Sequence, residues 1–299
     1  MYLVSAPGAK IAIRTGVFPS PGKLKVGFDI ILKLSDMETN WIDLWNKVSA
    51  FAPRTIEREK VIRGKKHFRR DSPVRPDPLL DFVLEKLTGE QSFLDIGAGN
   101  GRWIIPAAKI VRNVTAVEPS DSMLDMLHEN IAKAKLDNIR IIQGRWEEVD
   151  VEPHDIVSCT HAIYETKDFA AFIRKMEEKA REWCYLVLRL PPFDGVTGEL
   201  FQKIHGHPYD SPNAHLAYNA LYSMGIYPNV LVEEDIHNWR DTTFEEAFSR
   251  AKRHLNIGST SKYDDLIRET LTRRLTLHDG VYLWPDGMRS VLYWWHPWK

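Results

Sequence analysis

Strands and helices alternate through the middle of the chain, and this pattern limits the fold more than any other feature. Apolar segments typical of buried strands lie at residues 92–96, 113–118, 139–143, 155–160 and 184–190. Amphipathic segments typical of helices lie between them, at residues 101–110, 122–135 and 169–180. Such alternation favours parallel strands joined by right-handed crossover connections. We therefore predict an α/β fold with a doubly wound, mostly parallel sheet.

Capping and turn signals refine this pattern. We expect Asp121 or Ser122 to cap the helix at 122–135. A capping box at residues 242–245 and helical patterns at 213–224 and 264–277 predict further helices, and residues 230–232 are typical of a strand. The strand patterns at 281–284 and 290–295 flank Pro285-Asp286-Gly287, which predicts a β-hairpin.

The composition is that of an ordinary globular protein. Hydrophobic residues make up 43% and charged residues 27%, with a formal net charge of −1, which argues against a largely disordered chain. No stretch approaches the roughly 20 consecutive apolar residues that span a bilayer, so we expect no membrane partner. The N-terminus lacks the pattern of a secretory signal, and Cys159 and Cys184 fall in predicted buried strands. These features favour a soluble, cytoplasmic protein.

A glycine-rich turn follows the first of these strands. The segment Phe93–Arg102 contains Asp95 followed by three glycines, and a helix is predicted to begin directly after the glycines. Missing Cβ atoms let a backbone approach a ligand, and a helix N-terminus offers free N–H groups to an anion. The dinucleotide fingerprint requires glycine at the position of Arg102, which argues against a nicotinamide or flavin enzyme.

With this turn the sequence resembles the class I S-adenosylmethionine-dependent methyltransferases, of the type 11 and 12 kind. The resemblance covers about residues 77–190 and the last strand, and it is carried by four motifs in the same order. It implies a Rossmann-like core, a seven-stranded sheet whose last strand is antiparallel, and S-adenosylmethionine (SAM) as the cofactor.

The resemblance assigns cofactor contacts along the first two motifs. The residues that would wrap the methionine part of SAM are Asp95, Gly97, Ala98, Gly99 and Gly101. Glu118 stands 17 residues past Gly101 and would accept hydrogen bonds from both ribose hydroxyls. Pro119 follows it, and Met123 would contact the adenine, although Met123 is equally a candidate for the core.

The third and fourth motifs complete the predicted cofactor site. Gly144, Arg145 and Trp146 stand where the family often has Gly-Asp-Ala. Because Arg145 replaces the usual polar or acidic residue, backbone atoms or Glu147 would supply the contact to the adenine amine. Thr160 ends the fourth strand, in the segment that faces cofactor and substrate in the family.

His161 and Tyr164 are the predicted catalytic residues. Methyl transfer is an in-line displacement at a sulfonium carbon, so the enzyme mainly aligns the reactants and excludes water. Where an oxygen or nitrogen nucleophile needs a base, His161 is the candidate, because it follows a strand whose carboxyl end opens onto the ligand crevice. The alternatives are a hydrogen-bonded loop histidine and a tyrosine that only packs.

The segment before the core combines aromatic and basic residues. Trp41 and Trp45 recur at helical spacing, and we expect them to close over the site and face the sulfonium. Residues 54–75 then carry nine arginines and lysines against three acidic residues, a balance of +6. This stretch is a solvated helical face, an RNA-binding face, or a lid that supplies arginine to the cofactor carboxylate or an anionic substrate.

These observations predict four parts. They are an N-terminal extension (1–36), a helical lid (37–76), a SAM-binding core (77–190), and the substrate-pocket helices and final strands of the same domain (191–299). The predicted function is methyl transfer to an oxygen, nitrogen or sulfur atom of a small molecule. The alternatives are an RNA methyltransferase that uses residues 54–75, and a SAM-binding protein without catalysis. His205, His207 and Asp210 lack the spacing of known metal motifs, so no metal is predicted.

Overall fold

The computed structural model describes residues 5–6, 9–10, 39–50, 77–192, 194–209, 211–234, 239–285 and 287–298. The chain divides into two compact units, Met1–Asn40 and Trp41–Lys299. Within the first unit, β1 (Ser5–Ala6) and β2 (Ala9–Lys10) form a short antiparallel pair. The basic stretch at 54–75 and most of the predicted lid lie outside the described residues.

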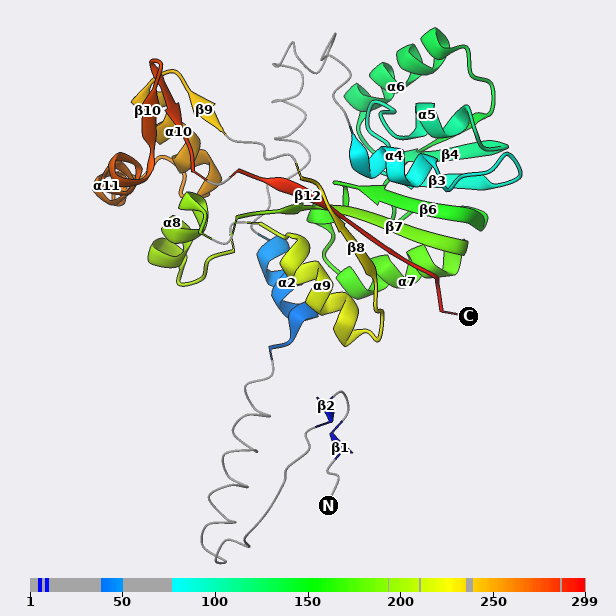
Figure 1. Ribbon diagram of the computed structural model, residues 1–299, viewed down its shortest axis with the longest axis horizontal. Helices are drawn as coiled ribbons and strands as arrows, with labels where there is room; N and C mark the ends of the chain where they lie inside the picture. Colours follow the sequence, from blue (N-terminus) through cyan, green and yellow to red (C-terminus); the bar gives the residue numbers. More distant parts are fainter. Residues whose placement is uncertain are drawn as a thin grey trace, which may run out of the picture. The chain divides into compact units, whose positions relative to one another are not determined.

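The second unit contains the predicted seven-stranded sheet (Figure 1). Its strands, in spatial order, are β5 (Ile139–Gln143), β4 (Asn113–Glu118), β3 (Ser92–Ile96), β6 (His154–Thr160), β7 (Ala180–Leu190), β12 (Arg289–Trp295) and β8 (Asn229–Val232). The first five are parallel, and β12 runs antiparallel to both β7 and β8. The predicted α/β fold with an antiparallel last strand is confirmed.

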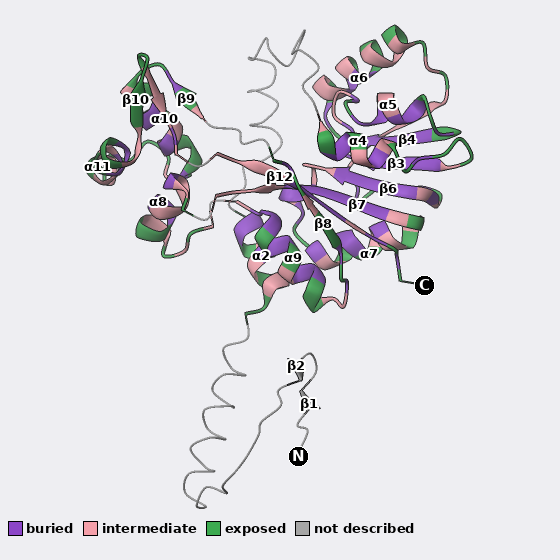
Figure 2. Ribbon diagram, viewed as in Figure 1, coloured by how far each residue is buried: buried purple, intermediate pink, exposed green. Residues whose placement is uncertain are grey.

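Helices cover both faces of this sheet, because alternate residues of each strand point to opposite sides. One face packs against α4 (Pro78–Leu84), α5 (Ile104–Ala108) and α6 (Asp121–Ala134). The other packs against α2 (Trp41–Ser49), α7 (Phe169–Lys179) and α9 (Ala214–Ser223). Figure 2 shows the central strands buried between the two layers. Cys159 and Cys184 are both free thiols in these buried strands.

Two predicted caps differ in detail from the observed ones. Ser120, rather than Asp121 or Ser122, caps α6, because its hydroxyl accepts a hydrogen bond from the Met123 N–H. At α10 (Phe244–His254) the cap is Thr243, whose hydroxyl accepts from the Glu246 N–H. The predicted box at 242–245 is therefore shifted by one residue.

A small subdomain with its own core comprises residues 196–205 and 240–284. It contains α8 (Val196–His205), α10, α11 (Asp264–Arg274) and a three-stranded sheet of β9 (Arg240–Asp241), β10 (Thr276–His278) and β11 (Val281–Leu283). Its core includes Leu200, Phe201, Phe248, Leu255, Ile267, Leu271 and Trp284. The chain enters it after β7, leaves it after α8 to form α9 and β8, enters it again after β8 and leaves it before β12. The three connections that join it to the sheet lie at the carboxyl ends of the parallel strands, where Figure 1 shows the subdomain.

The predicted hairpin between residues 281–284 and 290–295 is wrong. β11 pairs with β9 and β10, whereas β12 pairs with β7 and β8. The indole N–H of Trp284 donates to the buried Asp241 carboxylate over 2.7 Å and holds β11 in the small subdomain. The helix predicted to reach residue 277 ends at Arg274, since Leu277 belongs to β10. In the described ranges we find no helix with the length and apolar character of a membrane span.

Candidate functional site

The glycine-rich turn joins β3 to α5 in a left-handed backbone conformation. Gly97, Gly99 and Gly101 have φ values of 74°, 57° and 91°, which side chains rarely tolerate. A Cβ atom on Gly97 would lie 2.2 Å from the Cβ of Ala162, and one on Gly101 would lie 2.8 Å from a methyl carbon of Leu127. Among the described residues, apart from Gly99 and its two neighbours in the chain, no atom lies within 4 Å of a Cβ placed on Gly99. The turn is therefore packed at its two ends and open at Gly99, where a ligand can approach the backbone.

Glu118 ties the end of β4 to this open point. Its carboxylate accepts hydrogen bonds of 2.8 Å from the backbone N–H groups of Gly99 and Ser120, one on each oxygen. The residue is buried, which places a negative charge beside the turn. Each carboxylate oxygen has a second lone pair, so Glu118 retains acceptor capacity for ligand hydroxyl groups.

Asp95 lies beneath the turn, on β3. It is 2% exposed and accepts a hydrogen bond of 2.5 Å from the Ser158 hydroxyl on the neighbouring β6. Burial raises the pKa of Asp95 to about 7. The Ser158 hydrogen bond lowers this pKa, and the negative charge of Glu118 raises it further. Asp95 therefore exchanges its proton near neutral pH, and a cation above the turn would favour its ionised form.

The remaining predicted cofactor residues fall into two groups. Pro119 is exposed and Met123 half-buried at the start of α6, and Gly144 follows β5 with its N–H donating to the Glu118 carbonyl over 3.2 Å. Arg145 is half-exposed, 4.0 Å from Glu147. The Trp146 side chain lies in the core instead, with its indole N–H donating to the Phe172 carbonyl of α7 over 3.4 Å.

These residues fit S-adenosylmethionine. The backbone at Gly99 is open to the close approach of a ligand, and the Glu118 carboxylate beside it is an acceptor of the kind that ribose hydroxyls need. The Thr160 hydroxyl at the end of β6 is buried and has no hydrogen-bond partner among the described residues. A buried hydroxyl without a partner costs free energy, which a polar ligand at this edge would recover.

His161 and Tyr164 come together directly after β6. His161 has a φ of 54°, and its backbone N–H donates to the Val187 carbonyl of β7 over 2.9 Å. Its Nδ1 lies 2.9 Å from the Tyr164 hydroxyl, and its Nε2 lies 3.4 Å from the Ser290 hydroxyl at the start of β12. The pair therefore stands at the carboxyl edge of the sheet, where doubly wound folds bind ligands.

The hydrogen bonds of Tyr164 determine the tautomer of His161. The buried Tyr164 hydroxyl accepts the Arg189 backbone N–H over 2.7 Å, so its own hydrogen is left for Nδ1 of His161. A neutral imidazole that accepts at Nδ1 carries its hydrogen on Nε2. Burial also raises the pKa of Tyr164, which keeps the phenol protonated. Before the acceptor binds, His161 thus presents an N–H group towards Ser290.

The two tryptophans expected to close over the site have separate surroundings. Trp45 is fully buried, with its ring centre 4.7 Å from that of Phe169 on α7. Trp41 contacts His215 of α9 edge-to-face, with the ring centres 5.4 Å apart. Trp45 is therefore a core residue that anchors α2 to α7.

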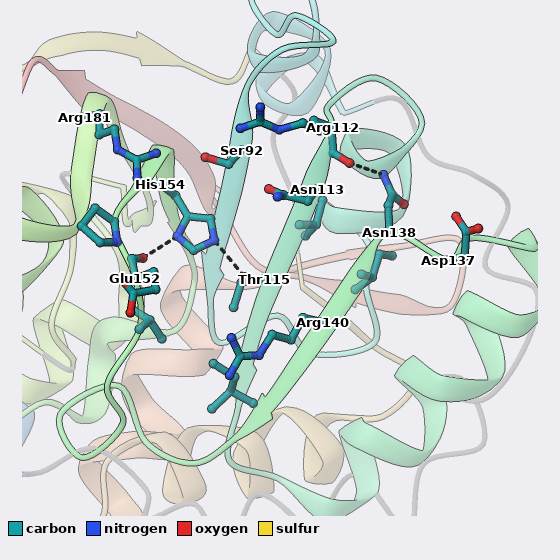
Figure 3. A pocket seen from close by; sticks show the side chains of 15 residues that line it. Ser92, Arg112, Asn113, Thr115, Asp137, Asn138, Arg140, Glu152, His154 and Arg181 are labelled. Carbon is teal, nitrogen blue, oxygen red and sulfur yellow. Dashed lines mark hydrogen bonds between the residues drawn. The ribbon is translucent and has the colours of Figure 1, made fainter.

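A separate cavity of about 460 Å³ lies at the opposite edge, beside the amino ends of the strands (Figure 3). His154 in its wall has both ring nitrogens engaged, by the Glu152 carbonyl at 2.7 Å and the Thr115 hydroxyl at 2.8 Å. Burial lowers the pKa of His154. Arg181 is paired with Asp155 over 3.2 Å. The cavity is separated from the glycine turn by the length of β3, so it is not the cofactor site.

Two residues of the carboxyl edge were absent from the sequence-based candidates. Ser290 contacts His161, and Arg189 stacks on Tyr164 with its guanidinium carbon 4.3 Å from the ring centre. The only signal for Arg189 is a charged residue near the end of an otherwise apolar strand. Ser290 carries no local signal, since its place depends on β12 pairing with β7.

Comparison with known proteins identifies the domain. Residues 93–182 match the family model described as "Methyltransferase domain". The chain is 26% identical over 167 residues to the ribosomal RNA small subunit methyltransferase G of Neisseria meningitidis, covering 54% of this chain and 74% of that protein. It is 36% identical over 83 residues to the probable ribosomal RNA small subunit methyltransferase A of Methanosphaera stadtmanae, covering 27% and 31%.

Among solved structures, the YcgJ protein of Bacillus subtilis aligns with a TM-score of 0.49 at 18% identity, covering 72% of this chain and 96% of that one. The glycine turn, the acid at the end of β4 and the match at residues 93–182 agree with one another. The chain therefore contains a SAM-dependent methyltransferase domain.

Proposed function

We propose that this methyltransferase transfers the methyl group of SAM to an oxygen, nitrogen or sulfur atom of a small molecule. SAM supplies an activated methyl group on a sulfonium. The observation that carries the proposal is the polar group His161, Tyr164 and Ser290 at the carboxyl edge, next to the connections of the small subdomain.

The proposed cofactor site uses the residues around the glycine turn. Glu118 accepts from the ribose hydroxyls with its remaining lone pairs while it holds Gly99. The backbone of Gly97, Ala98, Gly99 and Gly101 wraps the amino-acid tail, and ionised Asp95 favours its ammonium group. Pro119, Met123, Gly144 and Arg145 border the adenine, and Thr160 donates its hydroxyl hydrogen to the cofactor or acceptor.

The proposed acceptor site lies between β6 and β12. His161 is held from three sides, by the Val187 carbonyl, the Tyr164 hydroxyl and the Ser290 hydroxyl. A side chain fixed in this way orients a nucleophile better than a mobile one. As a base, His161 must act from its other tautomer, in which the Nε2 hydrogen has been exchanged for one on Nδ1 through water. The Tyr164 hydrogen then turns away, Nδ1–H donates to the phenol oxygen, and the Nε2 lone pair takes the acceptor proton.

The small subdomain supports a small acceptor. The three connections that join it to the sheet lie at the edge that carries His161, so residues 196–205 and 240–284 lie beside the proposed acceptor site. Pockets that surround small ligands are often built at such junctions. We propose that the segment from 191 onward walls the acceptor site, and that residues 77–190 form the SAM-binding core.

The names of the relatives favour a second candidate. The proteins from Neisseria meningitidis and Methanosphaera stadtmanae are both named as ribosomal RNA methyltransferases. An RNA substrate would use the basic stretch 54–75, whose charge provides the electrostatic attraction that RNA binding needs. A third candidate is a SAM-binding protein without turnover.

One labelling experiment separates the three candidates. The protein is incubated with methyl-labelled SAM and a cell extract, and the products are divided into RNA, protein and low-molecular-weight fractions. We expect label in the low-molecular-weight fraction, and none above background with Glu118→Ala at limiting SAM. Label in RNA that falls steeply as salt is added would support the RNA candidate instead. SAM binding without transfer to any fraction would support the non-catalytic candidate.

A further inference from the structure

An arginine at the end of β7 is fixed beside the proposed acceptor site. Its guanidinium carbon lies 4.3 Å from the centre of the Tyr164 ring, and its backbone N–H donates to the hydroxyl of the same tyrosine. Stacking on an aromatic face fixes the plane of a guanidinium group. Arg189 is thus positioned by the residue that also contacts His161.

The guanidinium of Arg189 has no counter-ion within the described ranges. Its Nε is buried and makes no hydrogen bond there. Glu233, at the same edge, accepts a hydrogen bond from the Ser290 N–H over 3.2 Å. A half-buried charge without a partner is unfavourable unless a ligand supplies one.

A second arginine adds positive charge at this edge. Arg289 pairs with Leu190 in the register of β12 and β7, one position from the pair of Arg189 and Ser290. Its Nε is likewise buried, with no hydrogen-bond partner in the part of the chain that the structure describes. Because neighbouring positions of a strand point to opposite faces of the sheet, Arg289 adds its charge on the other face, and Arg189 is the arginine that stacks on Tyr164. A guanidinium fork matches a carboxylate or phosphate group in particular.

We propose that the methyl acceptor is an anionic small molecule whose carboxylate or phosphate group binds Arg189 through paired hydrogen bonds. The atom to be methylated then lies at His161, because Tyr164 contacts both residues. This inference rests on the proposed function, since it names the class of the small-molecule acceptor.

The test follows the labelled products by charge. The low-molecular-weight products made by the full-length protein are passed over an anion-exchange column, with and without prior alkaline phosphatase. We expect the labelled product to be retained. Loss of retention after phosphatase identifies a phosphate ester, and retention after it identifies a carboxylate. Label found only in the column flow-through would contradict the anionic class and leave small-molecule methyl transfer intact.

Matched variants test Arg189 itself. We expect Arg189→Gln to lower kcat/KM for the labelled acceptor by at least about tenfold, mainly by raising KM. The kcat/KM of Arg189→Lys should lie between the values of Arg189→Gln and the natural protein. The affinity for SAM should change by less than about threefold. Arg112→Gln removes an exposed arginine at the opposite edge of the sheet and should change neither value. A loss of SAM affinity beyond about tenfold in Arg189→Gln would assign Arg189 to the cofactor and overturn the proposal.

A binding measurement keeps the inference testable if no small molecule becomes labelled. The protein is saturated with S-adenosylhomocysteine and treated with phenylglyoxal, which modifies arginine, and modification of Arg189 and Arg112 is followed by mass spectrometry. Malonate or inorganic phosphate should slow modification at Arg189 and leave Arg112 unaffected. If neither anion protects Arg189, or both arginines are protected equally, the inference is wrong, independently of the labelling result.

Discussion

The backbone N–H of Gly99 donates to the carboxylate of Glu118 over 2.8 Å, across 19 residues of sequence. This bond holds the open point of the glycine turn against the acid that ends β4. If Glu118 binds the ribose and the turn binds the amino-acid tail, as proposed above, this one bond positions both parts of the proposed cofactor site.

Replacing Glu118 should separate cofactor binding from folding. Charge-assisted hydrogen bonds contribute about 1.5–3 kcal/mol each, so Glu118→Ala should weaken SAM binding by about 10–100-fold in calorimetry. The far-ultraviolet circular dichroism should stay unchanged. Glu90→Ala removes an exposed acid just before β3, at the other edge of the sheet, and is the matched control. Unchanged SAM affinity in Glu118→Ala would refute the ribose assignment.

Two glycines of one turn should respond differently to alanine. Gly97→Ala places a Cβ 2.2 Å from Ala162, so we expect a fall in the free energy of unfolding of several kcal/mol, at least about 3. Gly99→Ala meets open space and should cost only about 1–2 kcal/mol for its positive φ, while weakening SAM binding. Urea unfolding and calorimetry of the two variants check this. Equal destabilisation by both would contradict the open position of Gly99.

The pKa of Asp95 predicts how the stability of the cofactor-free protein depends on pH. Burial raises the pKa from 3.8 to about 7, so between these values the unfolded chain has lost a proton that the folded protein keeps. The contribution of Asp95 to the free energy of unfolding therefore falls as the pH rises from about 4 to about 7, by up to about 1.4 kcal/mol per pH unit. Above a pH of about 7 this contribution stays constant.

Asp95→Asn removes this dependence. The stability of the variant relative to the natural protein should increase as pH rises towards about 7, which urea unfolding at several pH values measures. Asp137→Asn, an exposed change, is the control and should follow the natural protein. Parallel curves for Asp95→Asn and the natural protein would show that the pKa is not raised.

The pair His161 and Tyr164 gives a prediction about catalysis. If His161 is the base, His161→Ala lowers kcat by at least about 100-fold with SAM affinity changed less than about threefold. Tyr164→Phe removes the hydrogen that occupies Nδ1 and should lower kcat far less, by under about tenfold. The acceptor found by labelling serves as the substrate. A loss in Tyr164→Phe as large as that in His161→Ala would mean that the phenol itself is needed.

Local patterns account for what the sequence could predict. The five parallel strands, the glycine turn and Glu118 each depend on neighbouring residues, and the structure has them close to the expected positions. The caps shifted by a residue because several adjacent side chains can cap a helix equally well: Ser120 stands beside Asp121 and Ser122.

Non-local pairing accounts for what the sequence could not predict. Residues 281–284 and 290–295 look like partners, but Trp284 is held by Asp241, more than 40 residues earlier, and β12 pairs with β7 instead. The contact between Ser290 and His161, 129 residues apart, follows from that choice of partner. Trp146 and Trp45 have the expected residue type, but both rings lie in the core.

The most direct measurement is the transfer of labelled methyl groups from SAM by the full-length protein into a size-fractionated cell extract. We expect label in the low-molecular-weight fraction, dependent on Glu118 and His161. Label confined to RNA, or a protein that binds SAM and transfers no label to any fraction, would contradict it.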